Sequence, residues 1–193
     1  MTTEVQISDS ARLSFRLLDQ HDGALLFELD QDEAVMKYIN GGRRSSMADI
    51  NDRMLPRMMA YRNPAKGWGL WQVCQKATAQ TPTATYLGWV LVRPMGFFST
   101  TPKLDNLELG WRFKQACWGQ GFASEAALAV LTELAKQPGI RSFSAIAVPD
   151  NQASIAVMKK LGMQFVRQGL HADPTGDIEA VFYQRLLPDS SIT

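Results

Sequence analysis

The sequence opens with strand-like spacing of its apolar residues and then changes to helical spacing. Polar and apolar residues alternate with a period of two over 12–17, which predicts a strand. Helical spacing then predicts a helix that Asp19 can cap, a short helical turn over 35–38, and a longer helix over about 45–61. Pro56 lies inside the longer helix and predicts a kink or break there, because proline has no N–H to donate.

The middle of the sequence predicts an antiparallel hairpin followed by a long loop. Residues 68–74 and 86–92 have the composition of strands, and the polar segment between them is suited to a turn. Residues 93–106 contain two prolines and a glycine, so they predict an irregular loop of a length often associated with binding. A further strand is expected over 107–114.

The remaining sequence alternates between helical and strand-like segments. These are a helix over 122–136, a strand over 142–148, a helix over about 152–161, and strands near 163–169 and 178–187. With no internal repeat or linker, the alternation predicts a single α/β domain over 1–193, with a mixed central sheet of about seven strands and helices on both faces. Residues 1–10 and 188–193 are expected to be loose tails.

Composition and charge narrow the class of protein. The apolar fraction of 46% and the charged fraction of 20% are ordinary for a globular protein, and the formal net charge of +1 argues against a dedicated nucleic-acid surface. There is neither a long apolar run nor an N-terminal signal pattern, so we expect a cytoplasmic protein that does not engage a membrane. Cys74 and Cys117 form no disulfide framework and have no metal-ligand spacing with the histidines, so no metal is expected.

The segment 107–126 carries the clearest chemical signal. Gly119 and Gly121 form a tight loop between the strand and a helix that starts near Phe122. The first N–H groups of a helix have no partner within it and lie at the positive end of its dipole, so this loop predicts a phosphate or pyrophosphate site. It lacks the Lys-Ser/Thr pair of a P-loop and the three-glycine fingerprint of dinucleotide folds. The alternative is that the two glycines only turn the chain.

Three motifs in combination resemble the GNAT superfamily of acetyl-CoA-dependent N-acetyltransferases, and within it the branch of Rim ribosomal-protein N-terminal acetyltransferases. Trp118-Gly-Gln-Gly-Phe-Ala-Ser-Glu-Ala is similar to the Trp-Gly-Lys-Gly-Tyr-Ala-Thr-Glu-Ala of that branch. Glu108-Leu-Gly is similar to its Glu-Leu/Ile-Gly strand, and the helix from Asn151 to Gly162 to its Asn-x-x-Ser…Lys-Leu-Gly helix. The likeness is dense over 107–166 and looser over 13–92.

The resemblance implies a GNAT fold and a site for acetyl-CoA. In the family, backbone amides of the glycine loop hold the CoA pyrophosphate, and the preceding strand pairs with the pantetheine arm. The matching positions are Trp118, Gly119, Gln120, Gly121, Phe122 and Ala123 in the loop and Trp111, Arg112 and Phe113 in the strand. Asn151 matches a residue that contacts the cofactor arm, and it is also a good helix N-cap whatever the function.

Glu108 and Ser154 are the candidates for catalysis. Glu108 shares a strand face with Arg112, and as a base it would remove a proton from the attacking ammonium, directly or through water. The alternative for Glu108 is a salt bridge to Arg112 or to another cation. Ser154 matches the candidate acid of the Rim-like branch, whereas the tyrosine that many family members use is replaced here by Met158. The alternative for Ser154 is a purely structural role at the helix start, with water as the acid.

The resemblance therefore implies an N-acetyltransferase that acts on a primary amine, with a protein N-terminal α-amine among the acceptors. A polyamine, amino acid or aminoglycoside acceptor is an alternative, and so is a non-catalytic acyl-CoA-binding regulatory module. Polyamines are disfavoured by the basic residues of the region around the longer helix, which are Arg43, Arg44, Arg53, Arg57 and Arg62. The expected partners are acetyl-CoA and the amine acceptor, with neither nucleic acid nor membrane, and the expected assembly is a monomer or homodimer.

Overall fold

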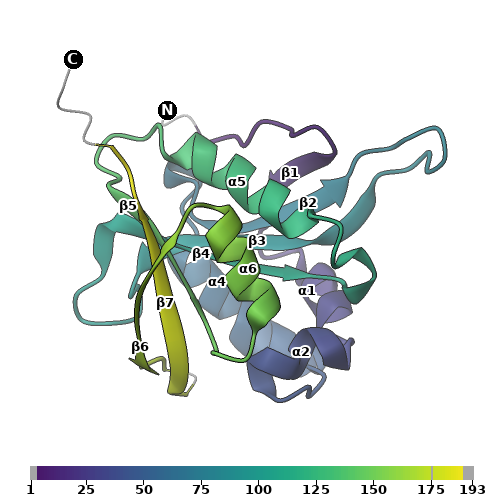
Figure 1. Ribbon diagram of the computed structural model, residues 1–193. Coiled ribbons are helices and arrows are strands. Elements are labelled where there is room, and N and C mark those ends of the chain that lie inside the picture. Colours follow the sequence, from purple (N-terminus) through teal and green to yellow (C-terminus); the bar gives the residue numbers. More distant parts are fainter. Residues whose placement is uncertain (1–3, 175, 189–193) are drawn as a thin grey trace.

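The fold is one mixed sheet with helices on both faces, as a computed structural model of residues 4–174 and 176–188 shows (Figure 1). Seven strands lie in the order β1-β2-β3-β4-β5-β7-β6. All neighbours are antiparallel except β4 and β5, which are parallel. The strands are β1 (Leu13–Leu17), β2 (Gly69–Gln75), β3 (Thr85–Met95), β4 (Lys103–Phe113), β5 (Ser142–Ala147), β6 (Gln164–His171) and β7 (Ile178–Leu186). The predicted α/β class and the predicted sheet of about seven strands are confirmed.

The helices divide between the two faces of the sheet. Helices α5 (Phe122–Leu134) and α6 (Gln152–Lys160) cover one face, where they bury Leu107, Leu109 and other apolar side chains of β4 and its neighbours (Figure 1). Helix α1 (Gly23–Asp30) and the helical segment 47–61 cover the other face through a second apolar cluster. Helix α2 (Glu33–Asn40) lies at the bottom of the view, below the start of α6.

The predicted helix over 45–61 is a continuous helical segment with a widened turn in its middle. It consists of α3 (Met47–Asp49), the π-helical turn η1 (Ile50–Met54) and α4 (Leu55–Tyr61), and Ser46 caps its start. The Leu55 N–H donates to the carbonyl of Ile50, five residues earlier. This wider turn stands directly before Pro56, whose ring would clash with the carbonyl four residues earlier in a regular helix.

Two local predictions need correction. The loop expected over 93–106 is shorter, because β3 continues to Met95 and β4 begins at Lys103. Strand β2 begins at Gly69, opposite Val92, so Pro94 lies where β3 has only β4 as a neighbour, and its missing N–H costs no bond on the open side. Helix α1 begins after Asp22 and not after Asp19, because Asp22 accepts the Asp19 N–H and closes a turn between them.

The N-terminal segment is packed from Val5 onward, contrary to the expected loose tail over 1–10. The Val5 N–H donates to the carbonyl of Pro64 at 2.9 Å, and Ile7 is 6% exposed in the main core. Residues 1–3 and 189–193, which belong to the predicted tails, lie outside the described residues. Among the residues that the structure does describe, no helix combines the length and apolar character needed to cross a membrane.

Candidate functional site

The sheet opens between β4 and β5. These parallel strands pair only at Asn106 with Ser142, Leu107 with Phe143 and Glu108 with Ser144. Beyond Glu108, residues 109–113 of β4 pair with β3 on one side only. Backbone N–H and C=O groups on the free edge of such a strand can pair with another extended chain or with a ligand that carries amide groups.

A glycine loop and an uncapped helix follow this open edge. Gly119 and Gly121 have φ values of 73° and 80°, in the left-handed region that favours glycine. Helix α5 begins directly after Gly121, and within the described residues no side chain caps it. Its first N–H groups are therefore available to an anion, and the helix dipole favours negative charge at the same place.

Helix α6 completes the site from the other side of the opening. The Asn151 side chain caps it, with its Oδ1 accepting the Ser154 N–H at 3.2 Å. This bond occupies the amide oxygen of Asn151 and leaves the amide NH₂ to face a ligand. The predicted role of Asn151 as a helix N-cap is confirmed, and its contact with the cofactor arm remains a prediction.

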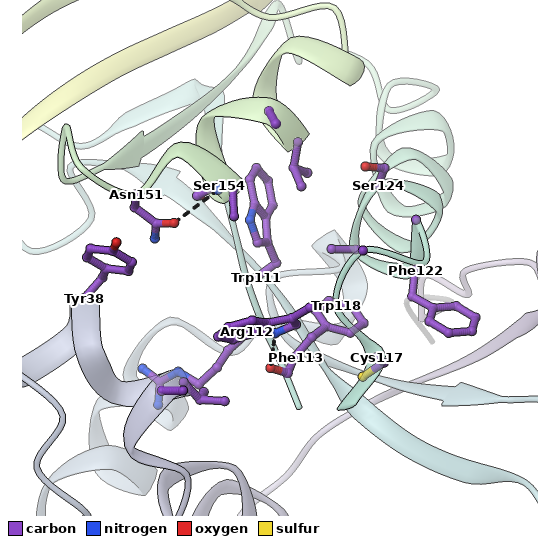
Figure 2. Close-up of a pocket in the computed structure, with 18 of the residues that line it drawn as sticks. Tyr38, Trp111, Arg112, Phe113, Cys117, Trp118, Phe122, Ser124, Asn151 and Ser154 are labelled. Atoms are coloured by element: carbon purple, nitrogen blue, oxygen red, sulfur yellow. Dashed lines mark hydrogen bonds between the residues drawn. The ribbon is translucent and has the colours of Figure 1, made fainter. Parts of the chain in front are cut away.

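These elements enclose one cavity of about 340 Å³. In Figure 2, Trp111 stands between α5 and α6, with Tyr38 and Asn151 on one side and Phe122 on the other. All of the predicted cofactor residues except Gln120 line the cavity, and so does Ser154. The lining residues are Ala34, Val35, Tyr38, Ile39, Trp111, Arg112, Phe113, Cys117, Trp118, Gly119, Gly121, Phe122, Ala123, Ser124, Asn151, Ala153, Ser154, Ala156, Val157 and Lys160.

Gln120 is turned away from the cavity and contributes to the shape of the loop instead. Its side-chain NH₂ donates to the carbonyl of Ala116 at 2.9 Å, and its own carbonyl accepts a bond from Arg12 at 3.1 Å. Trp118 also fixes the loop, because its indole N–H donates to the carbonyl of Phe113 at 2.9 Å. The glycine loop is therefore held on both sides by hydrogen bonds to backbone carbonyls.

Glu108 lies in a buried ion pair and does not line the cavity. Its two carboxylate oxygens accept bonds from Nε and Nη2 of Arg93, at 2.8 Å and 3.1 Å. Glu108 is only 4% exposed. Burial by itself lowers the pKa of Arg93, but the neighbouring carboxylate outweighs burial and raises it. The salt bridge considered as the alternative for Glu108 is present, with Arg93 as the cation and not Arg112.

Arg112 takes part in a second buried ion pair on the same face of the sheet. Its Nη1 contacts Asp30 of α1, and Asp30 also accepts the Ser45 hydroxyl at 2.6 Å. The guanidinium carbon lies 5.0 Å from the ring centre of Trp89. Among the described residues, the Arg112 Nε has no hydrogen-bond partner, although it is buried. A buried donor without a partner costs free energy, and this nitrogen lies beneath the surface that a ligand in the cavity could touch.

The sequence did not reveal the wall that α2 provides. Ala34, Val35, Tyr38 and Ile39 reach the cavity from this helix, whereas the sequence indicated only a helical turn. Ile39 lines the cavity and is 54% exposed, but no local sequence pattern marks it as a site residue. Lys160, Ser124 and Ala156 were also missed, because their place in the site depends on how α5 and α6 pack together.

Cys117 lines the cavity but is not an activated nucleophile. Burial raises the pKa of the Cys117 thiol, and its sulfur donates to the carbonyl of Lys114, so it behaves as a small filler side chain and not as an activated nucleophile. Within residues 4–174 and 176–188, no group of three or more His, Cys, Asp and Glu side chains could hold a metal ion.

Solved structures of known function share this fold. A RimL ribosomal L7/L12 α-N-protein acetyltransferase in complex with coenzyme A superposes with a TM-score of 0.69 at 17% identity, over 94% of this chain and 97% of that one. An aminoglycoside acetyltransferase in complex with coenzyme A and kanamycin superposes with a TM-score of 0.68 at 18% identity, over 90% and 94% of the two chains. The predicted GNAT arrangement of the sheet and helices is confirmed.

The sequence comparisons identify the family as well as the fold. The uncharacterised protein YkkB of Bacillus subtilis is 30% identical over 159 residues, which cover 80% of this chain and 83% of YkkB. The family profile described as an acetyltransferase (GNAT) domain matches residues 12–164, which include both walls of the cavity and the open edge of β4. On this match, the chain belongs to the GNAT acetyltransferase family.

Proposed function

We propose that this protein transfers the acetyl group of acetyl-CoA to a primary amine, with protein N-terminal α-amines as the leading class of acceptor. One observation carries the proposal: a single cavity joins an uncapped helix N-terminus to the free edge of β4. A pyrophosphate suits the first feature and an arm with amide groups suits the second. Acetyl-CoA combines both, and the family match together with coenzyme A-bound relatives of the same fold supports it as the co-substrate.

Each part of the cavity has a role on this proposal. Backbone amides from Gly119 to Ala123 bind the pyrophosphate, and the edge formed by Trp111–Phe113 pairs with the pantetheine arm. The free NH₂ of Asn151 is a donor for a carbonyl oxygen of that arm. Most of the rate enhancement then comes from holding thioester and amine together in one cavity.

The two proton transfers of the reaction are assigned to Glu108 and Ser154. Glu108 takes a proton from the acceptor ammonium so that the neutral amine can attack, and since it does not line the cavity it acts through water. Ser154 lines the cavity and donates to the departing thiolate. Met158, at the position where many family members have tyrosine, is fully buried in the core and cannot take this role.

Charge around the helical segment 47–61 does not decide the acceptor. Arg43, Arg44 and Arg53 are more than half exposed, but Arg43 and Arg53 contact Asp49 and Arg44 contacts Glu33. The preference for a peptide N-terminus over a polyamine therefore rests on the resemblance of the glycine loop and of α6 to the Rim-like branch. An amino acid or an aminoglycoside is the alternative acceptor, and one of the relatives of the same fold holds an aminoglycoside.

Release of free thiol from acetyl-CoA tests the proposal directly. The panel contains peptides with a free N-terminus, their N-terminally blocked forms, amino acids, polyamines and an aminoglycoside. We expect thiol release with the free peptides and not with the blocked ones. Release only with small amines would reject the peptide acceptor. Tight binding of acetyl-CoA without release for any amine would identify a non-catalytic binding module.

Replacing Gly121 with valine should weaken acetyl-CoA binding at least roughly tenfold, which is about 1.4 kcal/mol. A β-branched residue is strained at the φ of 80° that Gly121 adopts, so the loop must change shape. The added Cβ would itself make only ordinary contact with Arg12, at 3.6 Å, so backbone strain is the cause. Calorimetric titration with acetyl-CoA gives the affinity.

Gly139→Val is the matched control for this variant. Gly139 has a φ of 86°, no atom within 4 Å of an added Cβ, and a position beyond the far end of α5. Both variants should lose similar stability, but only Gly121→Val should lose affinity. Unchanged affinity in a folded Gly121→Val protein would remove the glycine loop from the binding site.

A further inference from the structure

Arg12, which directly precedes β1, reaches the glycine loop from outside the cavity. Its Nη2 donates to the carbonyl of Gln120 at 3.1 Å, and its guanidinium carbon lies 4.2 Å from the centre of the Phe122 ring. Its Nε donates to Glu125, in the first turn of α5, at 2.7 Å. One side chain therefore contacts the loop, the first residue of the helix and the first helical turn.

The contact with Gln120 fixes the direction of one peptide group. In a trans peptide the C=O and the following N–H point in opposite directions. The Gln120 carbonyl points toward Arg12, so the Gly121 N–H points away from Arg12. Gly121 lines the cavity and Arg12 does not, so this direction brings the amide to the cavity side. With φ values of 73° and 80° on both sides of Gln120, the loop has the freedom to turn this peptide over if nothing holds it.

Arg12 is itself held firmly enough to act as an anchor. Glu125 accepts three hydrogen bonds from this segment: from the Ser10 hydroxyl at 2.7 Å, from the Arg12 N–H at 3.0 Å and from the Arg12 Nε. The Arg12 carbonyl accepts the Lys76 N–H at 2.9 Å, which continues the sheet. Burial raises the pKa of Glu125, but the hydrogen bonds from Ser10 and Arg12 outweigh burial and lower it, so the carboxylate stays charged at neutral pH.

We propose that Arg12 is a positioning residue for the cofactor, which holds the Gln120–Gly121 peptide so that its N–H meets the pyrophosphate. The inference rests on the proposed placement of the pyrophosphate at the glycine loop. Arg12 does not line the cavity, so it acts through the backbone and not by touching the ligand. Its role should accordingly depend on whether the ligand carries a pyrophosphate at all.

Two acetyl donors separate this role from a general effect on the fold. Acetyl-CoA carries the pyrophosphate, whereas acetyl-pantetheine carries the same thioester and amide arm without it. For Arg12→Gln we expect the KM for acetyl-CoA to rise about fivefold, with kcat little changed. The kcat/KM for acetyl-pantetheine should equal that of the unmodified protein. Arg12→Lys should show the same loss, because an ammonium cannot bond Glu125 and the Gln120 carbonyl in the fixed geometry of a guanidinium.

Arg16→Gln is the matched control. Arg16 lies on β1, is 50% exposed against 44% for Arg12, and likewise bonds a carboxylate, Asp22, but it has no contact with the loop. It should leave both donors unaffected. An unchanged KM for acetyl-CoA in Arg12→Gln would overturn the proposal, as would equal losses for both donors. Full activity of Arg12→Lys would show that only the charge matters and would overturn the positioning role.

The Gly121→Val variant distinguishes failure of this inference from failure of the site. If Gly121→Val weakens acetyl-CoA binding and Arg12→Gln does not, the pyrophosphate site stands and the role of Arg12 is rejected. If neither variant discriminates between acetyl-CoA and acetyl-pantetheine, the pyrophosphate does not bind at the glycine loop, and both proposals fail together.

Discussion

Replacing Glu108 with glutamine should lower the free energy of unfolding by about 3–5 kcal/mol, because it leaves the buried Arg93 charge without its partner. The same variant should lower the acetylation rate at neutral pH if Glu108 removes the proton from the acceptor ammonium. This rate deficit should shrink as the pH rises, because the amine then loses its proton without help. Chemical denaturation gives the first effect, and initial rates over about pH 6 to 9 give the second.

Arg93→Gln breaks the same ion pair from the other side and is the control. It removes the guanidinium that bonds both Glu108 oxygens but keeps the carboxylate. Both variants should be destabilised, and rates should be compared at a temperature where each is folded. Because Arg93→Gln keeps the carboxylate, it should retain more of the rate than Glu108→Gln at every pH at which both are folded. If the two variants share one rate profile, Glu108 serves the fold and another group, or solvent, is the base.

Replacing Ser154 with alanine should lower kcat ten- to a hundredfold, on the order of 1.4–2.7 kcal/mol in activation free energy. The loss should fall on kcat, because the serine hydroxyl would donate a proton only as the thiolate leaves. The acetyl-CoA affinity should change little, since the Ser154 contribution to the helix cap comes from its backbone N–H, which alanine retains. Single-turnover measurements separate this chemical step from release of CoA.

Ser154→Thr keeps the hydroxyl and is the conservative partner of this variant. We expect it to retain most of the kcat that Ser154→Ala loses. A Ser154→Ala protein with undiminished single-turnover rates would leave water as the acid and Ser154 as a residue of the helix start. Similar losses in both variants would point to crowding or reshaping of the cavity in place of proton donation.

Local patterns along the sequence were sufficient for most of the architecture. The strand-loop-helix order around Gly119 and Gly121 and the cap at Asn151 depend on residues close in sequence, and both are present in the structure. Pro94 was predicted to be a loop residue because the sequence does not show that β2 begins opposite Val92 and leaves β3 one open side beyond it. The place of a strand within the sheet decides whether a proline is tolerated, and that is a tertiary property.

The residues that line the site were harder to predict from the sequence than the fold. Tyr38 and Ile39 reach the cavity because α2 packs across its opening, and no local pattern announces that placement. The partners of Glu108 and Arg112 on β4 were equally hidden: Glu108 meets Arg93 across β3 and β4, and Arg112 meets Asp30 at the end of α1. Alternation along β4 correctly predicted that both charges share a face, but it carries no information on which opposite charge each one meets.

The short pairing between β4 and β5 affects the stability of the sheet. Three residue pairs join β1–β4 to β5–β7, whereas β3 and β4 are paired along eight positions. A pantetheine arm bound along 109–113 would act as an additional strand at this seam. Binding of the ligand should therefore stabilise the junction between the two parts of the sheet. Amide hydrogen exchange at 109–113 should therefore slow in the presence of acetyl-CoA. In the free protein, this seam is where the two parts of the sheet are expected to separate first.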